Sequence, residues 1–172
     1  MADTNNKNTK GVQLTDRNML VPVRVFTNEF TRPNDTNAYA AGDVIGTSTT
    51  GPVLQSINLE LGWIVNAKLV SGKTGGTIPA GNFRVHLYNS TITAINDNSV
   101  FTMLYANKDK RIGYIDFSCI AGGSGSDAVA AIVTNINILN QFTTLYLVYE
   151  SLGAYTPVAQ QNFYLELTLN TL

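Results

Sequence analysis

The sequence predicts an all-β protein, and three observations lead to this prediction. Short apolar segments with period-two alternation recur along the chain and are separated by turn residues. Asn and Thr, which favour turns and strands respectively, together supply 39 of the 172 residues. No repeated helical segments lie between the predicted strands, so parallel βαβ units are not expected. We therefore expect an antiparallel β-sandwich or barrel.

Four strands are predicted in the first half of the chain. They cover residues 21–26, a short segment that ends at Gly46, residues 53–61 and residues 63–70. In the first, Val21, Val23 and Val25 share one face, and Pro22 is compatible with the start of an edge strand. Gly62 interrupts the apolar pattern between the third and fourth. One face of the third carries Val53, Ile57, Leu59 and Leu61.

Four further strands are predicted over residues 83–88, 112–117, 144–150 and 163–169. The alternation is clearest in the first of these, where Phe83, Val85 and Leu87 share one face. Asp97 is a suitable N-cap for one short helix or turn near 97–104, and residues 122–126 are predicted to form a loop. About eight strands suit a sandwich of the jelly-roll type best.

The domain organisation follows from length and local polarity. A chain of 172 residues has room for one hydrophobic core and buries about 70% of its unfolded surface. Residues 1–18 contain almost nothing apolar, so we expect a flexible N-terminal arm there and a single β-sandwich domain over 19–172. The arm is either a frayed terminus or a segment that orders on a partner.

Charge and hydropathy exclude several classes of partner. Only 13% of the residues are charged and the net charge is −1, so no basic field favours nucleic acid or an anionic membrane. No apolar run approaches the roughly 20 residues that span a bilayer. The first residues contain no apolar stretch of a secretory signal, so we expect synthesis in a cytoplasm.

The residues that usually carry catalysis or metals are scarce. His86 is the single histidine, so one chain cannot build a histidine metal cage. Because it alternates with Val85 and Leu87, we expect it on the solvent side or at a subunit contact. No Gly-x-Ser-x-Gly motif marks a nucleophilic serine. Cys119, the single cysteine, cannot form an intrachain disulfide and is predicted to be a small buried hydrophobe.

Acidic and glycine-rich segments also have structural explanations. Paired carboxylates could support glycoside hydrolysis, but the candidates lie in turns, at a cap or on the outward face of strands. These candidates are Asp43, Asp97, Asp127, Glu60 and Glu166. The 122–126 loop lacks the Lys-Ser/Thr of a phosphate loop. Calcium held by loop oxygens stays an alternative, although no EF-hand spacing occurs. We predict that the chain is not an enzyme and has no cofactor.

Several segments together resemble small virion proteins of tailed bacteriophages. The resemblance rests on their order and spacing, since no single phrase is specific. Near its centre Asp97-Asn98 is followed by Phe101, after the strand of residues 83–88. The segments cover residues 38–46, 83–88, 94–101, 111–117, 145–150, 155–157 and 163–167.

The resemblance implies a jelly-roll capsid decoration (auxiliary or cement) protein. Such a protein lies on the outer surface of the assembled head, binds the major capsid protein, often forms a homotrimer and carries no catalytic residues. Residues 1–37 lie outside the match, and the N-terminal arm is where we expect capsid or subunit contacts. The candidate contact residues are Asn5, Lys7, Lys10 and Gln13.

Two alternatives stay open. A carbohydrate-binding jelly-roll module needs exposed aromatic residues beside polar side chains, and the sequence neither supports nor excludes a glycan ligand. Trp63 or the tyrosines could stack on sugars, whereas Tyr146 and Tyr149 fit a core or interface equally well. A head-fibre or tail component that mediates host attachment could have the same fold. An enzyme such as a depolymerase is disfavoured by the single histidine and the absent motifs.

Overall fold

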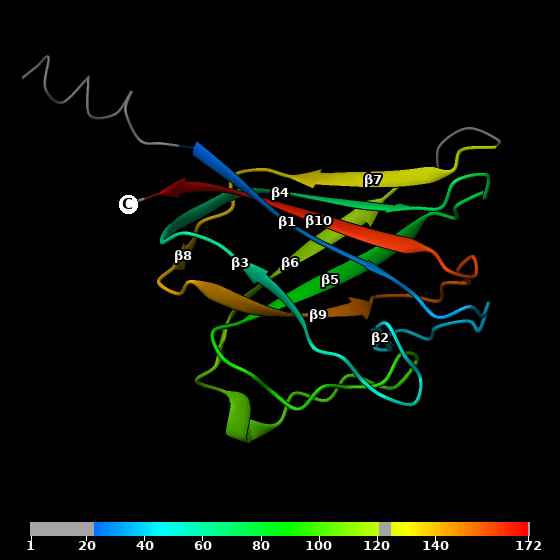
Figure 1. Ribbon diagram of the computed structural model, residues 1–172, viewed down its shortest axis with the longest axis horizontal. Coiled ribbons are helices and arrows are strands. Elements are labelled where there is room, and N and C mark those ends of the chain that lie inside the picture. Colours follow the sequence, from blue (N-terminus) through cyan, green and yellow to red (C-terminus); the bar gives the residue numbers. More distant parts are fainter. Residues whose placement is uncertain (1–22, 121–124, 172) are drawn as a thin grey trace, which may run out of the picture.

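Two antiparallel sheets pack face to face in the computed structural model, which describes residues 23–120 and 125–171 (Figure 1). The first sheet contains β1 (Val23–Thr31), β10 (Asn162–Thr171), β4 (Gly62–Gly72), β7 (Ala128–Val133) and β8 (Ile138–Asn140). The second contains β2 (Val44–Ile45), β3 (Gln55–Asn58), β9 (Thr144–Ser151), β5 (Gly81–Tyr88) and β6 (Arg111–Cys119). The predicted antiparallel β-sandwich is confirmed.

The strand connections follow the jelly-roll scheme. β2 and β3 pair with successive parts of β9, and β7 and β8 pair with successive parts of β4, so each short pair acts as one interrupted strand. Counted in this way, residues 23–120 and 125–171 form eight strands. The first pairs with the eighth (β1–β10), the second with the seventh (β3–β9), the third with the sixth (β4–β7) and the fourth with the fifth (β5–β6). This nesting is that of a double-sheet jelly roll.

The hydrophobic core lies between the sheets and follows the period-two pattern. Along β10, Phe163, Leu165 and Leu167 are fully buried, while the residues between them face outward. Phe83 of β5, in the opposite sheet, meets Phe163 edge to face at 5.3 Å between ring centroids. The alternation predicted for residues 83–88 and 163–169 therefore identifies core residues of both sheets.

The valines of β1 lie on its exposed face. Val23 and Val25 are 61% and 55% exposed, whereas Phe30 is buried. Val25 pairs with Thr168, a residue of the outward face of β10, so the register places the valines outside. β7 and β8 are also absent from the sequence prediction, because their alanines and half-buried residues show no strong alternation.

The segment between β5 and β6 covers part of the outer face of the second sheet. It contains the short 3-10 helix η1 (Tyr105–Asn107), which is the coil at the bottom of Figure 1. A helix or turn was predicted near 97–104, and the structure has a turn there, at residues 97–98. A second hydrophobic cluster lies beneath this segment. It contains buried Val44, Tyr88 and Val148, with partly buried Leu54, Ile92, Ile95, Phe101 and Tyr146 packed against them.

The predicted arm of residues 1–18 lies outside the described residues. In the part of the chain that the structure does describe, no helix is long and apolar enough to cross a membrane.

Candidate functional site

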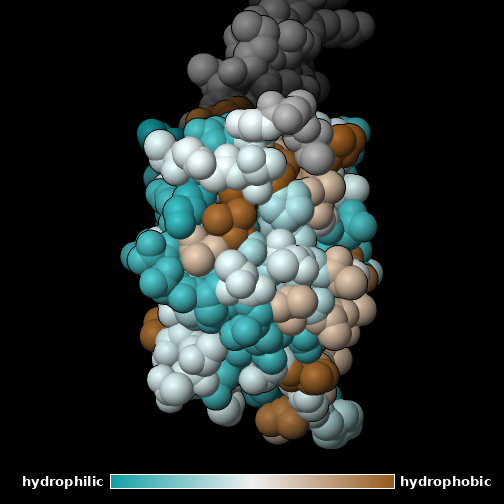
Figure 2. Space-filling view, turned by 90° about the vertical axis from the view of Figure 1, so that its right-hand side faces the viewer, coloured by the Kyte–Doolittle hydropathy of each residue, from teal (hydrophilic) through white to brown (hydrophobic). Residues whose placement is uncertain are grey.

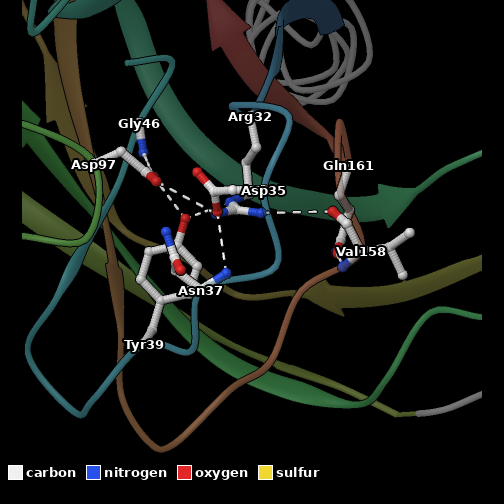
Figure 3. Close-up of polar contacts among 8 residues, drawn as sticks. All are labelled: Arg32, Asp35, Asn37, Tyr39, Gly46, Asp97, Val158 and Gln161. Atoms are coloured by element: carbon white, nitrogen blue, oxygen red, sulfur yellow. Dashed lines mark hydrogen bonds and ion pairs between the residues drawn. The ribbon is translucent and has the colours of Figure 1, made fainter. Parts of the chain in front are cut away.

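A buried polar network lies where the loop after β1 meets the segment after β5 (Figure 3). Arg32 follows β1 directly, and its Nη2 lies 3.3 Å from Asp97 Oδ2 and 3.3 Å from Asp35 Oδ1. The Tyr39 hydroxyl donates to Asp97 Oδ1 at 2.6 Å and accepts a hydrogen bond from Arg32 Nε. Gly46 N donates to the same Asp97 oxygen at 2.8 Å. Asp97 is therefore a buried acceptor and not the helix cap that its sequence context suggests.

This network has a structural role, because it is buried and joins distant segments of the chain. The side chains of Arg32 and Asp97 are almost completely removed from solvent. Burial, followed by the hydrogen bond to Asp97, raises the pKa of Tyr39, so the phenol stays protonated and remains a donor. A buried ion pair is favourable when further hydrogen bonds satisfy its remaining atoms, as they do here. The network joins chain segments 65 residues apart, and its central ion pair, Arg32 with Asp97, is closed to solvent.

The burial of His86 differs from what the sequence predicts. It faces away from Val85 and Leu87, as expected, but it is buried because Phe101 stacks on its ring at 4.2 Å between centroids. His86 Nε2 lies 2.7 Å from Glu150 Oε2. Burial lowers the pKa of His86, and the hydrogen bond to Glu150 opposes that shift. Among the described residues, no Ser, Thr or Cys side chain bonds to His86, so no nucleophile is paired with it.

An exposed ion pair lies beside His86 on the same face. Arg84 donates to both carboxylate oxygens of Asp116, at 2.7 and 2.8 Å, and these hydrogen bonds raise the pKa of the guanidinium. The same guanidinium lies 4.1 Å from the centroid of the Tyr114 ring. Arg84 and Asp116 therefore neutralise each other within the chain, and a second cation, Arg111, lies 4.9 Å from the same Tyr114 ring.

Cys119, Asp43 and Glu60, which the sequence analysis considered for catalysis or reactivity, are buried or pair with neighbouring groups of the chain. Cys119 is buried, as predicted, and burial raises the pKa of its thiol to about 11, so little of the reactive thiolate forms. Asp43 accepts a hydrogen bond from Ala40 N at 2.6 Å, and Glu60 lies 3.9 Å from Arg24 on the surface. Within residues 23–120 and 125–171, no three His, Cys, Asp or Glu side chains are grouped closely enough to hold a metal ion.

Four large hydrophobic side chains that are exposed to solvent lie close together in sequence on the segment between β5 and β6. We call Val100, Met103, Leu104 and Tyr105 the loop surface. Their exposed fractions are 68%, 48%, 49% and 81%. Val100 and Leu104 also line a cavity of about 180 Å³, whose floor includes Tyr88. By contrast, hydrophobic residues at the end of the sandwich in Figure 2 are mostly separated by polar ones.

Neither the buried network nor the loop surface was predicted from the sequence. In the sequence Arg32 resembles an ordinary surface residue, and no pattern indicates that Asp97 is its partner. The sequence does carry a signal for the loop surface, because Val100, Met103 and Leu104 lie at helical spacing within the helix or turn predicted near 97–104. The predicted contact residues Asn5, Lys7, Lys10 and Gln13 lie outside the described residues.

No protein-family model and no curated protein matches the sequence. Among the solved structures that are similar over most of the chain are the following three. "Cyanophage Pam1 capsid asymmetric unit" has 14% identity and a TM-score of 0.39, covering 87% of this chain and 85% of that one. "Structure of Eiger TNF from S. frugiperda" has 8% identity and a TM-score of 0.37, with coverages of 88% and 95%. "PRD1 vertex protein P5" has 10% identity and a TM-score of 0.32, with coverages of 86% and 96%.

Two of these three solved structures are therefore viral capsid or vertex proteins. Because each TM-score lies below 0.5, the likenesses are partial ones, and the proposed function rests on the chain's own residues.

Proposed function

We propose that the chain is a structural protein of a tailed-phage virion, and specifically a decoration protein that binds the outer surface of the assembled head and stabilises it. Its sequence resembles such proteins from about residue 38 to the end, in the order and spacing of several segments. The jelly-roll arrangement of its strands is the fold that this resemblance implies. The partner in this proposal is the major capsid protein, and the bound form is a homotrimer.

The loop surface is the observation that carries the proposal. Four large apolar side chains lie within six consecutive residues, and each is about half exposed or more. Single exposed hydrophobic residues are ordinary, but a gathered set indicates a protein contact. The segment is held in place by the second hydrophobic cluster beneath it and by the hydrogen bond from Phe101 N to Gly42 O at 2.7 Å. The surface is therefore presented ready-made, and binding orders little further chain.

A contact of this kind suits a shell that must withstand changes in salt. Apolar contacts are screened far less than exposed ion pairs, and the chain has few charges to offer. A protein that binds the assembled head better than free capsid subunits stabilises the head by about 2.7 kcal/mol per site at a hundredfold excess over Kd. A trimer that bridges neighbouring subunits gains further through effective concentration.

The experiment is co-sedimentation of the purified chain with expanded, undecorated heads of its source phage, with unexpanded proheads alongside. We expect saturable binding to expanded heads only, in copies that match three-fold positions. The double variant Leu104→Ser/Tyr105→Ser should weaken this binding at least tenfold. Absence of binding to both particles would remove the proposal.

A matched control separates the loop surface from general apolar exposure. Val25 and Ile132 are 55% and 68% exposed and lie in β1 and β7 of the other sheet. The double variant Val25→Ser/Ile132→Ser should bind expanded heads within about twofold of the unmodified chain. Equal weakening by both double variants would contradict the assignment of the contact to the loop surface.

A further inference from the structure

An open groove lies at one end of the sandwich, where three connections meet. It is bordered by the turn between β3 and β4, by the start of the segment after β5, and by the turn between β8 and β9 together with the first residues of β9. Its volume is about 550 Å³, within the range of about 300–1,000 Å³ typical of small-ligand sites. The lining residues are Leu61, Asn89, Ser90, Thr91, Gln141, Phe142, Thr143, Thr144 and Tyr146.

The lining has an unusual chemistry, because it contains no charged side chain. Amides and hydroxyls, which both donate and accept hydrogen bonds, line it together with two aromatic rings, those of Phe142 and Tyr146. Lys110 is the cation beside the groove, and its Nζ donates a hydrogen bond to the backbone Thr91 O at 2.9 Å. A phosphate or carboxylate ligand would therefore meet no free cation among the lining residues.

Several of these polar side chains are available to a ligand. Among the described residues, the side chains of Ser90, Thr91, Gln141 and Thr143 have no hydrogen-bond partner within the chain. Thr91, Gln141 and Thr143 are exposed, and Ser90 is half-buried. Their hydrogen bonds are thus made to water, which a ligand with matching hydroxyl groups can replace.

The walls of the groove are fixed before any ligand binds. The buried Asn140 amide donates to Glu60 O at 2.9 Å and to Phe142 O at 2.7 Å, which joins the two turns. Leu59 N donates to Thr143 O at 3.1 Å, and Thr144 Oγ1 donates to Asn58 Oδ1 at 2.9 Å. Preorganisation of this kind lowers the entropy that binding would otherwise cost.

From these features we propose that the groove binds a neutral carbohydrate. Sugars present many hydroxyl groups, which match the amides and hydroxyls of the lining, and they present C–H faces that pack on aromatic rings. This activity goes beyond head stabilisation, since it would let the molecule adhere to uncharged glycans. Of the other cavities, those of about 20 and 180 Å³ are too small for a sugar chain.

The test is binding of the full chain to an array of neutral and acidic oligosaccharides, followed by titration calorimetry with the strongest neutral binder. We expect binding confined to neutral glycans. The double variant Thr91→Ala/Gln141→Ala should lose at least tenfold in affinity. Thr156→Ala/Gln160→Ala, which changes the same exposed residue types in the connection between β9 and β10, should stay within twofold.

Three outcomes would overturn the inference. They are no binding to any glycan at millimolar concentration, binding to acidic glycans only, or equal affinity of the groove variant and the unmodified chain. None of these outcomes bears on head binding, because the loop surface and the groove share no lining residue.

Discussion

Asp97 is the residue on which the buried network depends. Its carboxylate accepts hydrogen bonds from Tyr39 and Gly46 and pairs with Arg32. Removing one partner of a buried pair typically costs about 3–5 kcal/mol. We predict that Asp97→Asn lowers the free energy of unfolding by about 3 kcal/mol, at the lower end because Asp35 still contacts Arg32. Urea denaturation measures this change.

Asp109 supplies the control for that substitution. Its side chain is 86% exposed and pairs only with Lys108, at 3.5 Å, among the described residues. Asp109→Asn should change stability by no more than about 0.5 kcal/mol. If Asp97→Asn cost no more than Asp109→Asn, the network would not contribute to stability.

The burial of His86 leads us to predict that the stability of the fold depends on pH. Burial beneath Phe101 lowers the pKa of His86 in the folded chain below its ordinary value of about 6.5, so the unfolded chain binds a proton more readily. The stabilising contribution is complete above the unfolded pKa and is lost as pH falls from there toward the folded pKa. The slope is at most about 1.4 kcal/mol per pH unit.

The variant His86→Gln isolates this contribution, since an amide can still bond to Glu150 but does not titrate. Unfolding in urea at pH 7.5 and pH 5.5 should show a larger loss of stability at the lower pH for the unmodified chain than for the variant. The difference between the two losses should be about 1 kcal/mol. Identical losses would show that His86 keeps its ordinary pKa in the folded state.

At the scale of a single strand, Gly62 allows β4 to approach β10 closely. A methyl group at this position would lie 2.9 Å from Thr171 Cα and closer still to Asn170 O. Both contacts are with backbone that β10 holds in its ladder, so neither atom can move aside cheaply. We predict that Gly62→Ala lowers the free energy of unfolding by about 1–3 kcal/mol, measured by urea denaturation.

Gly153 is the matched position for that prediction. A methyl group added there meets no atom within 4 Å, and the residue lies in a connection between strands. Gly153→Ala should leave stability within about 0.5 kcal/mol of the unmodified chain. Equal effects of the two substitutions would mean that the approach of β4 to β10 is not constrained by Gly62.

Elements with a regular pattern could be predicted from the sequence, and elements without one could not. The alternation in β5 and β10 identifies their buried faces, because each of those strands has one face in the core. β1 was located correctly, but its buried face could not be predicted, since the β-branched Val23 and Val25 lie on the exposed face and the register with β10 decides which face turns inward. Gly62 was read as an interruption, although it is where β4 begins.

The candidate sites depend on contacts that no local pattern contains. His86 is buried because a loop from later in the chain places Phe101 on its ring. Arg32 meets Asp97 only after the jelly roll closes. The groove combines Leu61, residues 89–91 and residues 141–144, which lie far apart in sequence. Each depends on the fold of the whole chain, so composition and spacing could only supply the residue types.

For the whole molecule, the loop surface and the groove are two separate surfaces of one sandwich, and each proposal uses one of them. The loop surface is apolar and lies on the segment between β5 and β6, while the groove is polar and lies where three connections meet. This arrangement suits a protein that binds a shell with one region and leaves another exposed.

Stabilisation of an assembled head is the proposed function of the chain. The most direct test is thermal release of DNA from expanded, undecorated heads, with and without saturating amounts of the chain. We predict that the chain raises the temperature of release and that Leu104→Ser/Tyr105→Ser does so only at much higher concentration. The groove variant Thr91→Ala/Gln141→Ala should protect the heads as well as the unmodified chain. An unchanged release temperature at saturation would show that the chain does not stabilise the head.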